Sequence, residues 1–317
     1  MKFATVKYQN EACLAISFQG NAKEFILWRD YVKQFPNDKV ITQTLNFLDF
    51  IKRSEILIPH LKKNEEALLA LPKHSFENAD FLMPYRPEVY RDFYCFEQHA
   101  KTMRKGRGLE MIPEWYQDPV FHYGNPTSFG GPVDVVAYPK DCQKLDLELE
   151  IACVIGKEIR NATLETARKA IFGYTLMNDW SARDFQDFDM KLNMGPTKGK
   201  DFATTFGSYV ITADELESKR SGKGYDIEVE ALINGERLVK NNWSTIYYSF
   251  EEMIVRASKN CTIYPGELIG SGTIGWGSLR EHHIEKGLSN WLKIGDTVAL
   301  NWLPEGPTIS NRIGNPV

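Results

Sequence analysis

Alternation of apolar and polar residues is the main pattern of this chain beyond residue 130, and it predicts β-strands. The predicted strands are residues 133–138, 145–155, 174–177, 209–212, 227–233 and 297–302. Helical spacing is rarer and predicts helices over 164–171 and 250–257, with Thr163 at the start of the first and Gly173 at its end. Many strands with few helices predict an α+β, mainly β fold rather than a parallel α/β sheet.

The first part of the chain has a more mixed pattern. Residues 3–6 and 12–18 alternate as strands do, whereas residues 44–58 and 61–71 place apolar side chains at helical spacing. Pro59 is expected to end or kink the first of these helices, because proline removes a backbone donor. Strands and helices together predict a small α/β unit here.

A change in composition suggests where this unit ends. Residues 75–87 contain Pro84 and Pro87 in mixed polar surroundings, which is typical of a linker. We therefore predict a small N-terminal domain of residues 1–85 and a larger domain of residues 86–317.

Length, charge and cysteine content narrow the class of protein. The 317 residues are 43% hydrophobic, which is enough for a packed core. A net charge of -4 argues against a nucleic-acid partner, although the basic cluster 101–107 could meet an anionic substrate. The chain shows neither an apolar signal core nor a run long enough to span a membrane, so we expect a cytoplasmic protein without a membrane partner. Five cysteines without a Cys-x-x-Cys motif predict reduced thiols.

Four acidic residues stand in apolar surroundings, where an uncompensated carboxylate is strongly unfavourable. They are Asp92, Glu148, Glu150 and Asp179. Because side chains alternate along a strand, Glu148 and Glu150 point to one face and present oxygen ligands side by side. A set of carboxylates suits Mg²⁺, Ca²⁺ or Mn²⁺ better than zinc. The sequence therefore predicts a site for a hard divalent cation.

A Glu-x-Glu pair can also be the solvated face of a half-buried sheet. Glu228 and Glu230 form a second such pair, and the alternation there continues to the hairpin turn Asn234–Gly235, so we interpret them as an outer polar face. The same interpretation is an alternative for Glu148 and Glu150 when their spacing is taken alone.

Two further side chains are candidates for chemistry. His99 follows Asp92 by seven residues, about two helical turns, which places both on one side of a helix or of a turn leading into it. His99 is thus a candidate general base, with a packed structural histidine as the alternative. Lys200 lies among glycines but without the pattern of a phosphate loop, and could offer its charge to a carboxylate or enolate.

Five segments, taken together, resemble the fumarylacetoacetate hydrolase family. They are residues 92–99, 147–150, 177–186, 199–205 and 271–273, and the resemblance covers about residues 92–300. The most specific is the string Asn-Asp-Trp-Ser-Ala-Arg-Asp-Phe-Gln at 178–186, which is too long to be expected by chance. The resemblance implies the family's β-rich roll in the larger domain, a homodimer, and action on 2,4-dioxo acids.

The resemblance also implies roles for individual residues. Asp92, Glu148, Glu150 and Asp179 correspond to the ligands of a divalent cation, with Mg²⁺ expected and Ca²⁺ or Mn²⁺ as alternatives. His99 corresponds to the base that activates water, Glu281 to the carboxylate that orients it, and Lys200 to a catalytic cation. Substrate-contacting positions are Tyr94, Tyr123, Arg183, Gln186 and Thr273, and Lys200 and Thr204 lie next to the cation's ligands.

The implied activity is metal-dependent hydrolysis of a carbon–carbon bond in a 2,4-dioxo acid, with fumarylacetoacetate as the first candidate and tyrosine degradation as the corresponding pathway. Acylpyruvates and sugar-derived diketo acids are alternative substrates, and decarboxylation, isomerisation or non-catalytic ligand binding are alternative functions. The presence of both His99 and Glu281 favours hydrolysis over isomerisation. Met190 stands where close relatives place a substrate-binding tyrosine, four residues after Gln186, so the substrate is left open.

Overall fold

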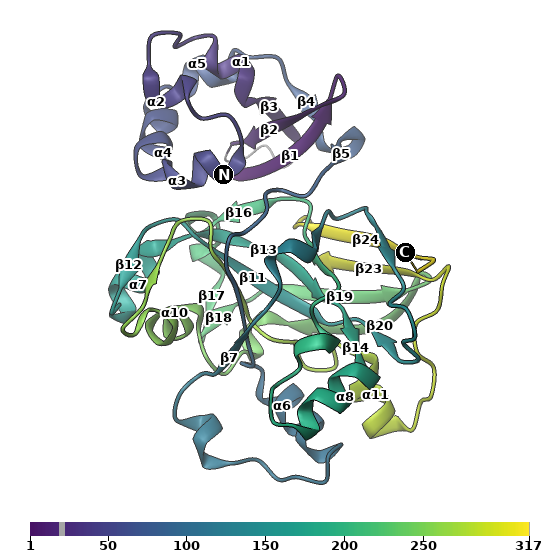
Figure 1. The fold of residues 1–317 in the computed structure, drawn as a ribbon. Coiled ribbons are helices and arrows are strands. Elements are labelled where there is room, and N and C mark those ends of the chain that lie inside the picture. Colours follow the sequence, from purple (N-terminus) through teal and green to yellow (C-terminus); the bar gives the residue numbers. More distant parts are fainter. Residues whose placement is uncertain (19–22, 317) are drawn as a thin grey trace.

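The structure is a computed structural model that describes residues 1–18 and 23–316. Within these residues one mixed sheet of 13 strands runs from the N-terminal part into the larger part of the protein (Figure 1). Its central path is β4-β3-β2-β1-β16-β13-β11-β22-β6-β7, with β5 beside β1 and with β15 joining β13 to β8. The bounds are β1 Lys2–Tyr8, β2 Glu11–Ser17, β3 Glu24–Leu27, β4 His74–Ser75, β5 Asp80–Phe81, β6 Tyr90–Phe93, β7 Phe121–Tyr123, β8 Phe129–Gly130, β11 Leu149–Ile155, β13 Ile171–Asp179, β15 Thr204–Phe206, β16 Val210–Thr212 and β22 Leu268–Gly270.

A second sheet has the order β20-β19-β23-β24-β9 and packs against β13 of the first. Its strands are β9 Val135–Ala137, β19 Glu228–Ile233, β20 Glu236–Asn242, β23 Thr297–Trp302 and β24 Thr308–Gly314. Three short pairs complete the strands: β10 Leu145–Asp146 with β14 Ser181–Ala182, β12 Ile159–Arg160 with β21 Thr262–Ile263, and β17 Arg220–Ser221 with β18 Gly224–Tyr225.

Helices surround the sheets. The α-helices are α1 Trp28–Val32, α2 Lys39–Thr42, α3 Phe47–Lys52, α4 Ser54–Lys63, α5 Glu65–Leu69, α6 Glu97–Lys105, α7 Leu164–Ala170, α8 Arg183–Lys191, α9 Ala213–Leu216, α10 Phe250–Ser258 and α11 Leu279–Lys286. The 3₁₀ turns are Phe76–Asn78, Pro113–Tyr116, Pro126–Ser128, Thr197–Gly199, Glu217–Lys219 and Trp243–Thr245. No helix among the described residues is both long and apolar enough to cross a membrane.

Both faces of β11 are covered, which explains why all seven of its residues are buried. Ile151 and Cys153 point into a core shared with the five-stranded sheet, where Val229 and Leu300 lie. Ala152, from the opposite face, belongs to a second core built with side chains of the N-terminal part. The central strands are thus the layer between two hydrophobic cores.

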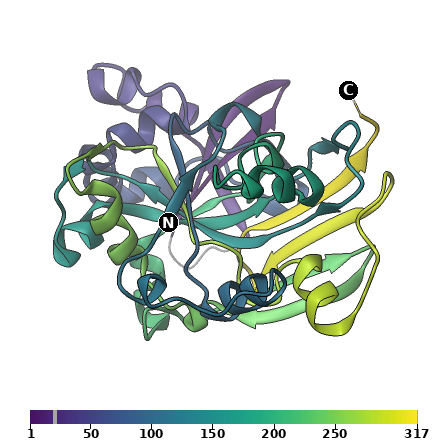
Figure 2. The ribbon, with the colours of Figure 1, turned by 60° about the horizontal axis from the view of Figure 1, so that its bottom comes forward.

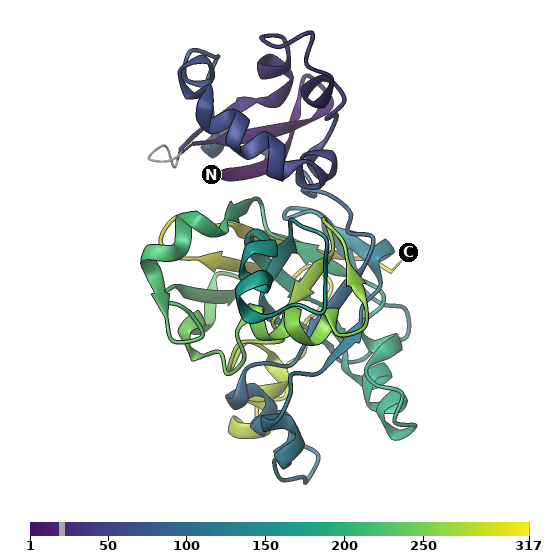
Figure 3. The same cartoon turned by 90° about the vertical axis from the view of Figure 1, so that its left-hand side faces the viewer.

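The N-terminal part contributes its helices and β1–β3 to this second core. Phe3 of β1 packs on Phe50 of α3 and on Phe172 of β13, with ring centroids 4.7 and 5.3 Å apart. The N-terminal part lies at one end of the molecule, and α6 and α11 lie at the other end (Figure 3). β1 pairs with β16 across the predicted boundary, and the division into domains of residues 1–85 and 86–317 stays a prediction.

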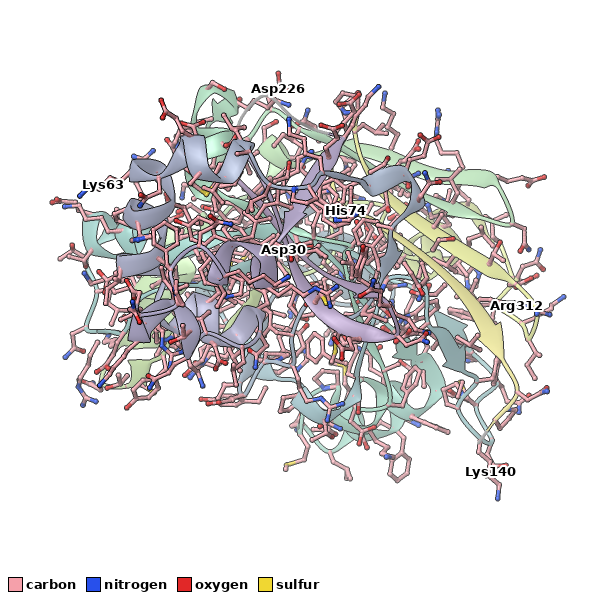
Figure 4. All side chains as sticks on the ribbon, turned by 90° about the horizontal axis from the view of Figure 1, so that it is seen from above. Asp30, Lys63, His74, Lys140, Asp226 and Arg312 are labelled. Carbon is pink, nitrogen blue, oxygen red and sulfur yellow. The ribbon has the colours of Figure 1, made fainter. Side chains whose placement is uncertain are left out.

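Many exposed charged side chains lie at the periphery of these layers. Seen from above, Lys63, Lys140, Asp226 and Arg312 extend from the rim, whereas Asp30 and His74 lie over the centre on the N-terminal part (Figure 4). The four peripheral residues are exposed. Glu228 is also exposed, but Glu230 of the predicted outer face is covered by Arg237 and Asn301, which both donate to its carboxylate.

The α+β, mainly β fold class is confirmed, and each strand predicted from alternation coincides with an observed strand. The predicted strand 145–155 is interrupted before β11, and β13 is longer at both ends than the predicted 174–177. Thr163 does cap α7, because its hydroxyl accepts a hydrogen bond from the backbone N–H of Thr166.

The prediction that Gly173 ends α7 is wrong. The helix ends at Ala170, and Gly173 lies inside β13. A Cβ at this position would stand 2.1 Å from the carbonyl oxygen of Ile211 on the neighbouring strand. Glycine is therefore required by close strand pairing and not by a helix end.

The predicted N-terminal helices are divided differently. The break falls at Arg53, between α3 and α4, and Pro59 lies inside α4 without ending it. Leu57 and Leu61 on the inner face of α4 are fully buried, and their burial outweighs the backbone hydrogen bond that proline removes. Residues 75–87 are not a simple linker, since β5 pairs with β1 there.

Phe50 tests the packing of the N-terminal core. Its ring is fully buried and packs on Phe3, Trp28 and Phe172. We expect Phe50→Ala to lower the free energy of unfolding by about 3–5 kcal/mol in urea denaturation, because it leaves a cavity. Leu45→Ala, at a residue 77% exposed, should change it by less than about 0.5 kcal/mol. Equal losses for both variants would contradict the packing described.

Candidate active site

Strand register brings the predicted acidic residues together. β13, β11, β22 and β6 are neighbours in the large sheet, and Gly270 of β22 lies between Ala152 of β11 and Asp92 of β6. Glu150 shares its face of β11 with Ala152, because side chains two residues apart point the same way. Asp179 ends β13, where its N–H donates to the carbonyl of Glu148. One end of one sheet face therefore collects all four carboxylates.

Gly270 provides the space for this arrangement. A Cβ on Gly270 would lie 2.4 Å from Asp92 Oδ1 and 3.1 Å from Glu150 Oε2. A side chain on β22 would thus force the two carboxylates out of place. The glycine is a structural requirement of the acidic cluster.

The carboxylates are buried and incompletely paired. Their exposed fractions are 4% for Asp92, 4% for Glu148, 0% for Glu150 and 1% for Asp179. Asp92 Oδ1, Glu150 Oε2 and Asp179 Oδ1 have no hydrogen-bond partner among the described residues. One carboxylate oxygen each from Glu148, Glu150 and Asp179 lie within 4.8 Å of one another. Buried oxygens without donors, gathered at this distance, fit a divalent cation.

Two buried cations neutralise part of this charge. Lys200 Nζ donates to Glu148 Oε2 and, at 2.5 Å, to Asp179 Oδ2. Arg183 is fully buried and donates through Nη2 to Glu148 Oε1 at 2.7 Å and through Nε to Asp146 at 2.8 Å. Both oxygens of Glu148 are thereby used.

These contacts determine the acidity of the cluster. Burial acts to raise the pKa of Glu148, but the charges of Lys200 and Arg183 lower it overall. Burial and the charges of Asp92, Asp179 and Glu148 raise the pKa of Glu150 well above its usual range. Burial raises the pKa of Asp179 to about 7, against the charge of Lys200. Without a cation the neutral form of Glu150 is thus favoured and Asp179 is partly protonated, and a bound cation would favour the ionised form of both.

His99 and Glu281 form a second group beside the carboxylates. His99 lies in the first turn of α6, and its Nδ1 is 2.9 Å from Oε2 of Glu281 at the start of α11. Glu281 is fully buried and accepts from the N–H of Trp276 at 2.9 Å and from the hydroxyl of Ser278 at 3.1 Å. A carboxylate held in this way can fix the orientation and tautomer of the imidazole.

Asp146 connects the two groups, and its role was not recognised in the sequence. It is fully buried, receives Arg183 at its carboxylate, and accepts the N–H groups of Leu279 and Arg280 in the first turn of α11. The signal was present, because Asp146 continues the alternation of Glu148 and Glu150. Asp146 therefore positions α11, which carries Glu281, relative to the acidic cluster.

A cavity of about 250 Å³ opens beside these groups. It is bounded by α6, α8 and α11, which lie on the side turned forward in Figure 2. Predicted site residues that line it are Asp92, Tyr94, His99, Glu148, Glu150, Gln186, Lys200 and Thr273. Thr273 also donates to Glu150 Oε1 at 3.5 Å. One cavity is therefore lined by three of the four predicted metal ligands, by the histidine and by most of the predicted substrate contacts.

Five predicted residues do not line the cavity. Two of them, Asp179 and Glu281, contact the lining residues Lys200 and His99 from behind. Tyr123 is 64% exposed, and its ring packs on the guanidinium of Arg91 outside the cavity. Arg183 is buried behind Glu148, where it also donates to Gln186 Oε1 at 2.9 Å. Thr204, in β15, is buried opposite Asp179. The structure thus gives Arg183 a position among the charges and does not bring Tyr123 to the cavity.

Two other lining residues, His122 and Met103, were missed in the sequence, and His122 stands beside Asp92. Met190 and Arg107 of the basic cluster, which the sequence did single out, form further parts of the wall. Burial acts to lower the pKa of His122, but its hydrogen bond to Asp92 and that residue's charge raise it overall. In β7 the side chains alternate, so His122 points inward and Tyr123 outward.

The sequence of this region matches a known family model. Residues 88–314 match the model described as fumarylacetoacetate (FAA) hydrolase C-terminal. The chain belongs to the fumarylacetoacetate hydrolase family. Among named relatives, the fumarylacetoacetase of Oryza sativa subsp. japonica is 26% identical over 300 residues, which are 76% of this chain and 70% of that protein. The fumarylacetoacetase of Arabidopsis thaliana is 28% identical over 63% of this chain, and the match spans only 58% of that protein's length.

Solved structures share the fold over almost the whole chain. Fumarylacetoacetate hydrolase from Exiguobacterium antarcticum has a TM-score of 0.72 at 22% identity, with 99% of both chains covered. Maleylpyruvate hydrolase from Sphingobium sp. SYK-6, in complex with manganese(II) and pyruvate, has a TM-score of 0.71 at 18% identity, with 100% of both chains covered. The predictions of the family, of its fold and of an enzyme of this family are confirmed.

Gly270→Ala tests the acidic cluster. The added Cβ should push Asp92 and Glu150 apart, so we expect the affinity of the metal-free protein for a divalent cation to fall at least about tenfold. Calorimetric titration with Mn²⁺ measures this change. Gly130→Ala in β8 is the control, because its Cβ would come no closer than 3.3 Å to Asp134. Unchanged affinity in folded Gly270→Ala protein would contradict the arrangement.

Proposed function

We propose that this protein is a metal-dependent hydrolase that cleaves a carbon–carbon bond in a 2,4-dioxo acid, with fumarylacetoacetate as the first candidate substrate. The observation that carries the proposal is that His99, Lys200 and the carboxylates of Asp92, Glu148 and Glu150 line one cavity. Behind them, Glu281 lies 2.9 Å from His99 and Asp179 accepts from Lys200. A binding protein would need the carboxylates to hold a cation, but it would have no need for a base with its own orienting acid.

Asp92, Glu148, Glu150 and Asp179 are the residues that would hold the cation, with Mg²⁺ or Mn²⁺ as the ion. When bound, a divalent cation would polarise the substrate carbonyl and stabilise the enolate that leaves. Lys200, held between Glu148 and Asp179, keeps a positive charge at the same end of the cavity. Burial acts to lower the pKa of Lys200, but the charges of Asp179 and Glu148 raise it overall, so it stays protonated.

His99 would activate the water. Nδ1 lies 2.9 Å from Oε2 of Glu281. A neutral ring with its proton on Nδ1 would place this proton next to the carboxylate and leave the lone pair of Nε2 free to accept a proton. Water that loses this proton adds to the substrate carbonyl, and the bond to the neighbouring carbon breaks with both electrons on the leaving enolate. The protonated Nε2, or Lys200, can then return a proton to that carbon, so the products are two acids.

The cavity wall supports an anionic substrate with an apolar portion. Arg107 and Tyr94 offer a charge and a hydroxyl, while Met103, Met190 and Phe121 are apolar. Acylpyruvates and sugar-derived diketo acids therefore remain alternative substrates. Cleavage of fumarylacetoacetate would place the protein in tyrosine degradation, and this pathway, the homodimer and the cytoplasmic location stay predictions.

Loss of the diketo-enol ultraviolet absorbance tests the function. Purified protein is incubated with fumarylacetoacetate and a panel of short acylpyruvates, with Mg²⁺ or Mn²⁺ and with a chelator as the control. We expect absorbance to fall on at least one substrate only when the cation is present, with two acids as products. Products that keep all carbons would indicate isomerisation, release of carbon dioxide would indicate decarboxylation, and no turnover with binding would indicate a ligand-binding protein.

His99→Gln separates catalysis from metal binding. Removal of a general base costs typically about 10²–10⁴-fold in rate, so kcat should fall by that factor. Metal affinity should be nearly unchanged, because His99 is not among the grouped donors of the acidic cluster. Glu281→Gln should lower kcat in the same direction by releasing the ring. Full activity in His99→Gln would refute this mechanism.

A further inference from the structure

His122 is the one nitrogen donor among the metal-ligand groups recognised in the described part of the chain. Its Nε2 lies 3.3 Å from Asp92 Oδ2, and one donor atom each from Asp92, His122 and Asp179 lie within 4.8 Å of one another. Asp179 also belongs to the group with Glu148 and Glu150. His122 therefore extends the carboxylate cluster and is not a separate feature of the wall.

The other ring nitrogen indicates which way the lone pair points. Nδ1 of His122 lies 3.3 Å from the carbonyl oxygen of Tyr123, and a carbonyl can only accept. The proton of a neutral ring is thus on Nδ1, and the lone pair of Nε2 faces Asp92. A lone pair and a carboxylate oxygen repel each other unless a cation, either a proton or a metal ion, lies between them.

We propose that His122 binds the divalent cation through Nε2, together with Asp92 and Asp179. The inference rests on the cation of the proposed function and adds a ligand of different chemistry to it. Two observations support it. Metal-binding histidines commonly donate their second ring N–H to a backbone carbonyl, as Nδ1 does here, and Asp92 Oδ1 and Asp179 Oδ1 have no donor among the described residues.

A nitrogen ligand changes which ions the site prefers. Mg²⁺ and Ca²⁺ favour oxygen ligands alone, whereas imidazole suits transition metals, and affinity for such sites rises from Mn²⁺ through Fe²⁺ to Co²⁺. The site should therefore favour Mn²⁺, Fe²⁺ or Co²⁺ over Mg²⁺. This differs from the expectation of Mg²⁺ that the carboxylates alone suggested.

Two variants separate binding from mere positioning. His122→Gln keeps a side-chain N–H that can donate to Asp92 but removes the imidazole nitrogen, and His122→Phe removes both. His60→Gln is the matched control, because His60 lies in α4 of the N-terminal part and contacts Tyr31. Circular dichroism and thermal unfolding verify that each variant is folded.

The first measurement is the affinity of metal-free protein for Mn²⁺ and for Mg²⁺. We expect the affinity for Mn²⁺ relative to that for Mg²⁺ to fall about tenfold or more in both His122 variants and to stay unchanged in His60→Gln. The second is pulsed electron paramagnetic resonance of the Mn²⁺-loaded protein. It should show the coupling of a directly bound imidazole nitrogen in the natural protein and in His60→Gln, and not in either His122 variant.

Each other outcome rejects the proposal. If His122→Gln keeps the natural ratio of Mn²⁺ affinity to Mg²⁺ affinity, or if no directly bound nitrogen is seen in the natural protein, His122 only positions Asp92 through a hydrogen bond. A nitrogen signal that persists in His122→Phe would assign the ligand to another residue. If the natural protein binds neither cation, the proposed function fails as well, which distinguishes the two failures.

Discussion

Compensation of buried negative charge is the constraint on which the site depends. Five carboxylates lie at one end of the sheet with exposed fractions of 4% or less: Asp92, Asp146, Glu148, Glu150 and Asp179. Burying a carboxylate without a partner is strongly unfavourable, and the two buried cations Arg183 and Lys200 contact only Asp146, Glu148 and Asp179. The register of β6, β22, β11 and β13 nevertheless holds the acids together. The cluster therefore has the chemistry to accept a further positive charge.

The elements were predictable because alternation is a local property. The strands around Glu150 and Asp179 followed from apolar residues at every second position, and the helix start at Thr163 from its capping chemistry. Features that depend on partners distant in the sequence were not predictable. Gly173 was misread because its neighbour on β16 is not visible in the chain, and Pro59 because the burial of α4 outweighs the local preference.

The site shows the same division. The acids, His99 and Glu281 were found because they lie in motifs. The structure brings Asp92, Glu148, Glu150 and His99 to one cavity, with Asp179 and Glu281 in contact behind it. His122 was missed in favour of its neighbour Tyr123, and the difference is a single residue of register in β7. Because a shift of one position reverses the face of a strand, a sequence match by itself cannot decide between adjacent residues.

The charges within the cluster are not evenly distributed, and this asymmetry indicates how it would accept a cation. Glu148 uses both oxygens for Arg183 and Lys200, whereas Asp92, Glu150 and Asp179 each keep an oxygen without a donor among the described residues. A cation would therefore be attracted to the unpaired oxygens of these three residues. Asp179 connects the parts of the site, because it contacts Lys200 and belongs to both groups of possible metal ligands. Its loss would divide the cluster, whereas loss of Asp92 would leave the group of Glu148, Glu150 and Asp179 intact.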